Sequence, residues 1–415
     1  MTRDPVAEIL RYNRRFRGRT PDLLGRKIAL MAESPFVFLR GTFHLFARDW
    51  AEGRFDAWPD DSPIRDDSLR IVADLHGENF GTYGGEHHRV HYGINDFDES
   101  TTGRLDFDAC RGATSLLLAA SRQGLLLRSA AIGAHAFVEM YVDALDGLPK
   151  PFRSPLIQKL IRTAEAAHRP AFIRKRTVLR GGVRRFAGEH YFRLDAAHQA
   201  QALRLHEDYL RRVRPRPGRG PEFFEVEDVA GRIAGCGSLG RLRYVVLVRG
   251  EDADAAKEAK EVILEYKESL PSALDEARGR AGDRASRKDR ARQVVEAARR
   301  FQENPGPFLG YAVDGDLSFQ VRQVGPREFR LGPEALAGGH QYRETASSYG
   351  AYLADAHRRA NGARAMRILR EAVGRRREAF IRRTMSFALA YAEQVEEDWR
   401  ALRRERRRIE RELSD

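Results

Sequence analysis

Hydrophobic positions recur at helical spacing over the first 60 residues, where SPFVFLRGTFHLFARDW (34–50) predicts one or two amphipathic helices beginning at Ser34-Pro35. The period then changes to that of strands. LRIVAD at 69–74 is typical of a β-strand, and VHYGIND at 90–96 is a second β-type segment after a glycine-bearing stretch. The two segments predict that a loop joins two strands in the first quarter of the chain.

Residues 105–210 show a mostly helical pattern, and RRVRPRPGRGPEFF at 211–224 is rich in Pro, Gly and Arg, which favours a domain boundary there. Beyond it, β-rich segments predict an antiparallel sheet, interrupted by a charged helical region at 272–303. Helices resume from 341, and the interleaved charges of the tail predict a solvated helix held by i,i+4 ion pairs. The predicted strands are 223–235, 241–250, 261–269, 309–313 and 317–324.

Composition narrows the class of protein. Hydrophobic residues make up 42% and charged residues 32% of the 415, which excludes an integral membrane protein and argues against wholesale disorder. The net charge of +13 suggests an anionic partner, but only eight of the 73 basic residues are lysines, so a codon preference explains the excess more economically. Cys110 and Cys236 cannot form a disulfide framework, and the N-terminus lacks the apolar stretch of a signal peptide. We therefore expect a cytoplasmic protein.

The segment DLHGEN places the carboxylate of Asp74 and the carboxamide of Asn79 five positions apart in a loop after a predicted strand. A phosphoryl-transfer loop needs such a pair, because an acid orients an attacking hydroxyl and accepts its proton while an amide oxygen holds Mg²⁺. A second cluster, INDFD at 94–98 with Asp96 and Asp98, ends the next strand, and its Asp96 can supply the principal carboxylate ligand of Mg²⁺. An acidic turn that caps its neighbours is the alternative for either cluster alone.

The segment GCGSLG, with Gly235, Gly237, Ser238 and Gly240, lies between two predicted strands. A dinucleotide fold requires a helix after such glycines, whereas strand, glycine turn and strand lay backbone N–H groups over ATP phosphates in protein kinases. Lys267 lies in the next strand of a chain with few lysines, which indicates that a compact ammonium is needed, as for contacts to the α and β phosphates. A surface lysine at the end of the strand is the alternative.

A kinase pairs that lysine with a glutamate on the following helix. Glu296 is the candidate and Glu276 the fallback, with an ordinary exposed helical position as an equal alternative for either. The order of the parts is unusual, because a kinase has its glycine turn and lysine before its catalytic loop and metal aspartate. Compact domains often have neighbouring termini, so a rotated order can preserve the same site. The order predicts an α+β, two-lobed, protein-kinase-like fold that is circularly permuted.

The expected organisation has three parts. Residues 1–215 form a helical part with the catalytic loop and N-terminal decoration, 216–330 form a nucleotide-binding antiparallel sheet with a helix, and 331–415 form helices that return to the first part. The helix ending YGAYLADAHRR, at 349–359, should then lead spatially into the strand before Asp74.

Eight phrases carry a resemblance: MAESPFVFLRG, DLHGENFG, INDFDES, GCGSLGR, YKES, VVEAARRFQ, FQVRQ and LADAHRR. They resemble a bacterial family of unknown function that is grouped with kinase-like phosphotransferases, over nearly the whole chain. DLHGEN and DFD are also similar to the catalytic loop and metal aspartate of aminoglycoside phosphotransferases and choline kinases, which write the first as HGDLHxxN. The resemblance implies Asp74 as catalytic aspartate, Asn79 and Asp96 as magnesium ligands, and Asp108 as a buried aspartate that braces the loop.

Val72 and Ala73 replace the histidine and glycine usual before the catalytic aspartate, a departure that concerns the bracing of the loop more than its chemistry. Arg40 and Arg322 lie in apolar surroundings, where an unpaired guanidinium is unfavourable, so each should meet a carboxylate or a phosphate.

These patterns favour an ATP- and Mg²⁺-dependent phosphotransferase acting on a hydroxyl of a small molecule or a protein. One alternative is a nucleotide-binding pseudokinase or scaffold, although the joint presence of Asp74, Asn79, Asp96 and Lys267 disfavours it. Another is a nucleotidyl (AMP) transferase on the same fold, with ATP bound in reverse. A nucleic-acid partner is disfavoured because the basic residues are dispersed among acids rather than clustered with aromatic platforms, and no membrane partner is expected.

Overall fold

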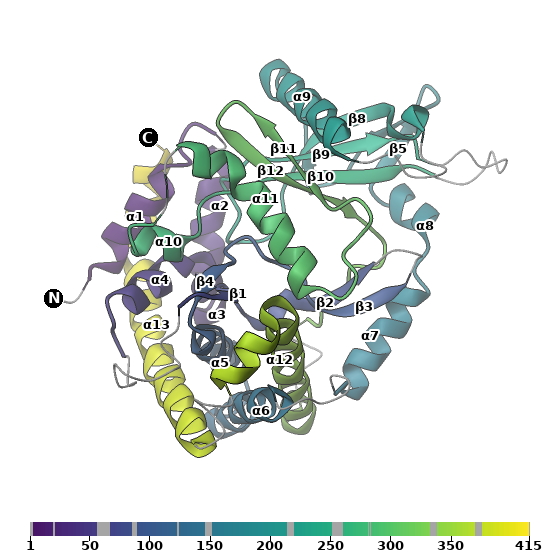
Figure 1. The fold of residues 1–415 in the computed structure, drawn as a ribbon. Helices are drawn as coiled ribbons and strands as arrows, with labels where there is room; N and C mark the ends of the chain where they lie inside the picture. Colours follow the sequence, from purple (N-terminus) through teal and green to yellow (C-terminus); the bar gives the residue numbers. More distant parts are fainter. Residues whose placement is uncertain are drawn as a thin grey trace.

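Helices and a six-stranded antiparallel sheet build a mixed α+β fold in the computed structural model (Figure 1). The predicted α+β class is confirmed. No helix among the described residues is both long and apolar enough to cross a membrane. The structure describes residues 3–19, 21–55, 67–84, 89–122, 124–145, 152–213, 220–250, 260–280, 282, 284–332, 338–369 and 376–414.

A helical part gathers both ends of the chain around one hydrophobic core. Its helices are α1 (Pro5–Arg14), α2 (Pro21–Met31), α3 (Pro35–Gly41), α4 (Phe43–Ala51), α5 (Leu105–Arg122), α6 (Leu127–Leu145), α12 (Gly339–Leu369) and α13 (Arg377–Ser414).

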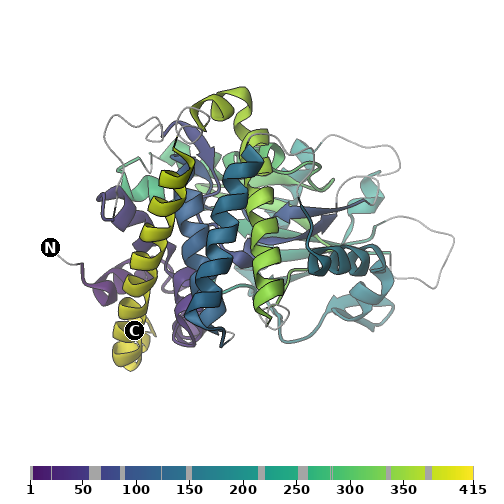
Figure 2. The same ribbon diagram turned by 90° about the horizontal axis from the view of Figure 1, so that it is seen from below.

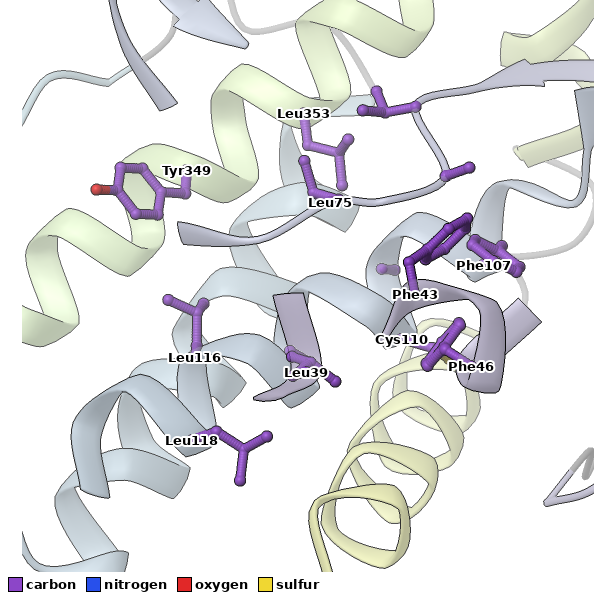
Figure 3. Close-up of a cluster of buried hydrophobic side chains, with 14 of the residues drawn as sticks. Leu39, Phe43, Phe46, Leu75, Phe107, Cys110, Leu116, Leu118, Tyr349 and Leu353 are labelled. Atoms are coloured by element: carbon purple, nitrogen blue, oxygen red, sulfur yellow. The ribbon is translucent and has the colours of Figure 1, made fainter. Parts of the chain in front are cut away.

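The packing of this part follows from its apolar faces. Helices α5, α6, α12 and α13 lie side by side (Figure 2). Phe43 and Phe46 of α4 pack with Phe107 of α5, and Leu75, next to Asp74, lies in the same core with Leu353 of α12 (Figure 3). The core therefore anchors the loop that carries Asp74.

The predicted helix start at Ser34-Pro35 is confirmed. Ser34 is the N-cap of α3, and its Oγ accepts a hydrogen bond from Val37 N at 3.3 Å. The tail helix α13 also carries the expected i,i+4 pairs, such as Arg406 with Glu410 at 2.7 Å.

The six-stranded sheet has the order β11-β12-β10-β9-β8-β7, and every neighbouring pair is antiparallel. Its five longer strands are the ones predicted, and the charged helix α11 (Arg284–Phe301) follows the third of them in the chain. In Figure 1, α11 lies between the sheet and the helical part. The strands are β7 (Tyr191–Phe192), β8 (Val226–Arg232), β9 (Arg243–Val248), β10 (Val262–Glu268), β11 (Gly310–Asp314) and β12 (Leu317–Val324).

The two faces of this sheet have different covers. Helix α9 (Ala196–Arg212) packs Leu205 and Tyr209 against Leu264 and its neighbours on one face. On the opposite face, Ile263 packs with Phe186 and other apolar residues of the segment that precedes β7. The rest of that face carries Lys267 and is turned toward the helical part. Alternation along β10 thus separates a core-forming side from a site-forming side.

The predicted domain boundary near 215 lies outside the described residues, which resume at 220. Strand β7 and helix α9 precede residue 215, yet β7 is a strand of the sheet and α9 covers it. The sequence also predicts a mostly helical pattern from 105 to 210. Within that range, β5 (Thr177–Arg180) and β6 (Val183–Phe186) instead form a hairpin. These strands are too short to produce a period that the sequence could reveal.

Short strands frame the loop with Asp74. Strand β1 (Leu69–Ile71) pairs with β4 (Thr101–Gly103), and β2 (Phe80–Gly84) forms a hairpin with β3 (Val90–Ile94). Asp74 lies between β1 and β2. The other short elements are α7 (Pro155–Glu165), α8 (Arg169–Arg174), α10 (Ala273–Ala277) and the 3₁₀ helices Gly77–Asn79 and Pro221–Phe224.

Candidate functional site

A pocket with a volume of about 790 Å³ lies between the sheet and the helical part. Its lining includes Asp74, Asn79 and Asp96 from the loops around β2 and β3, and Lys267 from β10. Gly235, Gly237 and Ser238 of the turn between β8 and β9 also line it. Segments far apart in the sequence thus contribute to one cavity. Of the residues predicted for the site, Gly240 and Glu296 are not part of this lining.

The loop before Asp74 is held by a buried aspartate. The Asp108 carboxylate accepts hydrogen bonds from Val72 N at 2.7 Å and Ala73 N at 2.8 Å. Ala73 has a φ of 70°, an unfavourable region for a residue with a Cβ, so these bonds stabilise a strained conformation. His357 Nε2 of α12 lies 2.8 Å from the same carboxylate, and Tyr141 Oη lies 2.9 Å from His357 Nδ1. The bracing expected of Asp108 is confirmed.

Asp74 itself is fixed by Arg111 of α5. The guanidinium donates to Asp74 Oδ1 at 2.6 Å and to Leu39 O at 2.8 Å, and it lies 4.9 Å from the centre of the Phe46 ring. Arg111 is fully buried, and an unpaired cation there would be unfavourable. Burial raises the pKa of Asp74 to about 6, although Arg111 opposes the shift. The carboxylate is therefore ionised at neutral pH but remains a competent proton acceptor.

The two expected magnesium ligands, Asn79 and Asp96, differ in exposure and in how far their oxygens are engaged in hydrogen bonds. Asn79 is buried, and its Oδ1 accepts a hydrogen bond from His76 N at 2.7 Å, so one lone pair of that oxygen is engaged. Asp96 follows β3 with its side chain 45% exposed, and its Oδ1 accepts a long hydrogen bond of 3.3 Å from Asp98 N. Asp96 is the more accessible of the two ligands.

Lys267 forms ion pairs with the aspartates of the same loop. Its side chain is 9% exposed, and Nζ contacts Asp98 Oδ2 and lies 3.9 Å from Asp96 Oδ2. Asp98 also pairs with Arg241 at 3.3 Å and accepts a hydrogen bond from Gln320. Burial alone would raise the pKa of Asp98, but Lys267 and Arg241 outweigh it and lower that pKa. The surface-lysine alternative is excluded, because the ammonium faces the pocket.

Lys267 does not form the expected ion pair with Glu296 or with Glu276. Glu296 is 42% exposed on α11 and pairs with Arg292, one turn earlier on the same helix, at 3.1 Å. Glu276, the fallback, pairs with Arg15 at 2.8 Å. The apolar face of α11 is buried, which turns Glu296 toward solvent and leaves Lys267 to the aspartates.

The predicted strand, glycine turn and strand are confirmed, and two of the glycines are required by their surroundings. A Cβ on Gly237 would lie 2.9 Å from Arg40 O, so the turn packs closely on the end of α3. Gly240 has a φ of 96°, and a Cβ there would meet Phe16, so this glycine serves packing against the N-terminal helices. Ser238 Oγ donates to Ala234 O at 2.8 Å, which closes the turn on itself.

Three cations surround one carboxylate on the part of the sheet that roofs the pocket. The buried Glu265 of β10 binds Arg322 at 3.0 Å and also pairs with Arg232, while Arg243 lies 3.7 Å away. Burial would raise the pKa of Glu265, but the arginines lower it well below its usual range. Arg322 also binds Glu328 at 2.8 Å. The expectation that Arg322 meets a carboxylate is confirmed, as it is for Arg40, which binds Glu78 at 2.9 Å.

Sequence reasoning missed three side chains around this site, Arg111, Arg241 and His357, and it placed Asp98 in the acidic cluster without pairing it with Lys267. A signal existed for Arg111, because it follows Asp108 by three positions on a helix that is otherwise apolar, where a buried cation needs a partner. Asp98 lies two positions after Asp96, and the pattern alone could not say which of them faces Lys267.

The oxygen donors suit Mg²⁺ shared with phosphates. Among the described residues, no group of three or more His, Cys, Asp and Glu side chains could hold a metal ion by itself. Mg²⁺ in nucleotide sites usually takes one or two protein carboxylates together with phosphate oxygens and waters. Asp96 and the Asn79 amide would supply hard oxygens to such a site.

Comparison with known proteins gives one relationship. No curated protein and no solved structure matches the chain. The model of a family described as "Uncharacterized protein conserved in bacteria (DUF2252)" matches residues 19–405, which include the loop with Asp74, the glycine turn and Lys267. The match spans far more than half of the sequence. The chain therefore belongs to this bacterial family of uncharacterised proteins.

Proposed function

We propose that the protein is an ATP- and Mg²⁺-dependent phosphotransferase that acts on a hydroxyl group, with a two-lobed, kinase-like arrangement in permuted order. One observation carries the proposal: a single pocket joins Asp74, Asn79 and Asp96 of the helical part to the glycine turn and Lys267 of the sheet. Lys267 also lies on β10, the third strand when β8, which precedes the glycine turn, is counted as the first, and this is the position of the phosphate-binding lysine in protein kinases.

Contacts between α12 and β1 support the permuted order. Asn361 of α12 accepts a hydrogen bond from Arg70 N at 2.7 Å and donates one to Arg70 O at 3.0 Å. His357, from the segment 349–359, reaches the aspartate that braces the loop. A helix late in the chain thus adjoins the strand before Asp74, as the rotated order requires.

In this proposal, Asp74 orients the acceptor hydroxyl and receives its proton. The acceptor oxygen forms a bond to the γ-phosphorus, the bond between that phosphorus and the oxygen of ADP breaks, and the hydroxyl proton passes to the Asp74 carboxylate. Arg111 holds the carboxylate in place through its bond to Oδ1. Mg²⁺, when bound by Asp96 and Asn79, neutralises charge on the phosphates.

Lys267 would contact the phosphates without losing its anchor. An ammonium has three donors, and Asp98 occupies one of them. The glycine turn would present backbone N–H groups to the same phosphates.

The three arginines around Glu265, on the sheet side of the pocket, favour AMP transfer as a second candidate function. A nucleotide base stacks best on apolar or aromatic surfaces, whereas phosphate oxygens prefer guanidinium groups. Arg232, Arg243 and Arg322 therefore suit phosphates better than a base. ATP bound in reverse would place its phosphates under these arginines, and AMP would pass to the acceptor.

Incubation of the protein with a cell metabolite extract and ATP labelled separately at the γ and α phosphates distinguishes these functions. An acceptor product labelled only from γ-labelled ATP supports the phosphotransferase, and an acceptor product labelled from α-labelled ATP supports AMP transfer, whereas label that stays on ADP supports neither by itself. The Asp74→Asn variant is the matched control, since it removes the base and retains the shape. Nucleotide binding with no transfer of either label would favour the pseudokinase or scaffold.

A further inference from the structure

We propose that the acceptor carries an anionic group, a phosphate or a carboxylate, and that Arg40, His76 and Arg330 bind this group beside Asp74. The inference rests on the proposed function only for the identity of the acceptor side of the pocket, and it holds whether phosphoryl or AMP is transferred.

The position of the three residues places them on the acceptor side. His76 lies two positions after Asp74 in the loop between β1 and β2. Arg330 lies opposite Gly81 of β2 in an isolated β-bridge, and Arg40 is at the end of α3. All three line the pocket, whereas Lys267 and the sheet arginines approach it from the roof.

Positive charge exceeds negative charge in this cluster. Glu78 is shared by both arginines, with Arg40 at 2.9 Å and Arg330 at 3.7 Å. The Arg330 side chain is 56% exposed, so it keeps donors for a ligand. The neighbouring cation Arg111 is matched by Asp74 and adds no surplus. One positive charge thus remains unneutralised within the cluster.

Two buried polar atoms of the cluster point to a missing partner. Arg40 Nε and His76 Nδ1 are both buried, and neither has a hydrogen-bond partner in the part of the chain that the structure describes. His76 is only 7% exposed, so the pocket is where a partner can approach it. Buried polar atoms are normally satisfied. Arg40 Nε carries a proton in every state, and His76 Nδ1 is a donor in the tautomer that has its proton there, so in that tautomer the oxygens of a phosphate or carboxylate would satisfy both.

Because both arginines share Glu78, two kinds of substitution should change the affinity for the anion in opposite directions. Glu78 occupies the arginines that the anion needs, so the anion and Glu78 compete. Removing the competitor should strengthen anion binding, and removing a cation should weaken it. A site for a cationic acceptor would respond in the opposite sense to both changes.

Titration calorimetry with inorganic phosphate, in a Lys267→Ala background that weakens the nucleotide-phosphate site, measures this. Arg330→Gln should weaken phosphate binding by roughly tenfold, the usual loss for a charge-assisted hydrogen bond, and Glu78→Gln should strengthen it. Arg404→Gln, which removes an exposed arginine of α13, is the matched control and should have no effect. The inference is overturned if phosphate does not bind at millimolar concentration, or if Arg330→Gln behaves like Arg404→Gln.

An acceptor panel identifies the charge preference in the intact protein. Glycerol phosphate, glycerol and choline are small hydroxyl compounds that are anionic, neutral and cationic. With Mg²⁺ and ATP, transfer to glycerol phosphate above the other two supports the inference, and preferential transfer to choline overturns it. If no ATP is consumed with any extract or compound, the proposed function fails, while the phosphate titration still decides whether the anion site exists.

Discussion

The imidazole of His357 lies 2.8 Å from the carboxylate of Asp108, although the two residues are 249 positions apart in the chain. Asp108 in turn holds the backbone of Val72 and Ala73, which immediately precede Asp74. A residue of α12 is thereby connected to the candidate catalytic loop through one buried carboxylate. Activity and stability should both depend on this connection.

Substitution of His357 by Phe should loosen the loop. The change removes the hydrogen bond to buried Asp108, which we expect to lower the free energy of unfolding by about 1–3 kcal/mol and to reduce turnover. Urea denaturation and the transfer assay measure the two effects. His340→Phe, at an exposed position of the same helix, is the control and should change neither. Equal stability of His357→Phe and His340→Phe would contradict the bracing role.

Asp74→Asn should separate chemistry from binding. The amide cannot accept the hydroxyl proton, so turnover should fall by roughly 10² to 10⁴, while the affinity for Mg²⁺-ATP stays nearly constant. Calorimetry and the labelled-ATP assay test the two parts. A wild-type rate in this variant would reject the assignment of the loop and with it the permuted, kinase-like arrangement.

The rate should rise with pH through the pKa of Asp74. Burial raises this pKa to about 6, and only the ionised carboxylate can accept a proton. The rate should therefore be nearly constant at pH 7 to 8 and fall about tenfold per pH unit well below 6. The residual rate of Asp74→Asn should lack this acidic limb, and the same limb in wild type and variant would assign the titration to another group.

Lys267→Ala should weaken the binding of Mg²⁺-ATP while the fold is retained. Lys267→Arg should not restore it, because a guanidinium is larger and planar, whereas the proposed role needs a compact ammonium that pairs with Asp98 and leaves donors for phosphates. Lys159→Ala, at an exposed position of α7, is the control. Full binding by Lys267→Arg would show that only a positive charge is needed.

Magnesium should strengthen ATP binding, and Asp96 should account for most of that gain. Asp96→Asn is expected to bring the affinity measured with Mg²⁺ close to the affinity without it. Asp98→Asn should instead disturb Lys267 and Arg241, which it partners. Asp289→Asn, on the exposed side of α11, is the control for the loss of one surface carboxylate. Equal effects of the Asp96 and Asp289 changes would remove Asp96 from the metal site.

Local patterns in the sequence predicted the parts of the site that depend on neighbouring residues. The glycine turn between β8 and β9 and the strand around Lys267 follow from β-rich runs on both sides of the glycines. Bracing by Asp108 came from its resemblance to a known loop.

The partner of Lys267 could not be predicted in the same way. The sequence allows either Glu296 or an aspartate after β3 to pair with Lys267. Which of them forms the ion pair depends on which face of α11 is buried and on how the chain turns after β3. Both are set by packing between distant segments. The same holds for β7, whose two residues pair with β8 only because the sheet offers an edge there.

The close packing of Gly237 on Arg40 O has a mechanical consequence. In a turn that projects freely into solvent, the backbone can lift to admit a nucleotide and settle again afterwards. Here the end of α3 packs directly against the turn, so the turn cannot move unless the sheet also moves away from α3. A chain that lacked the first 50 residues would lose this support, and the proposed phosphate-binding turn would be free to move.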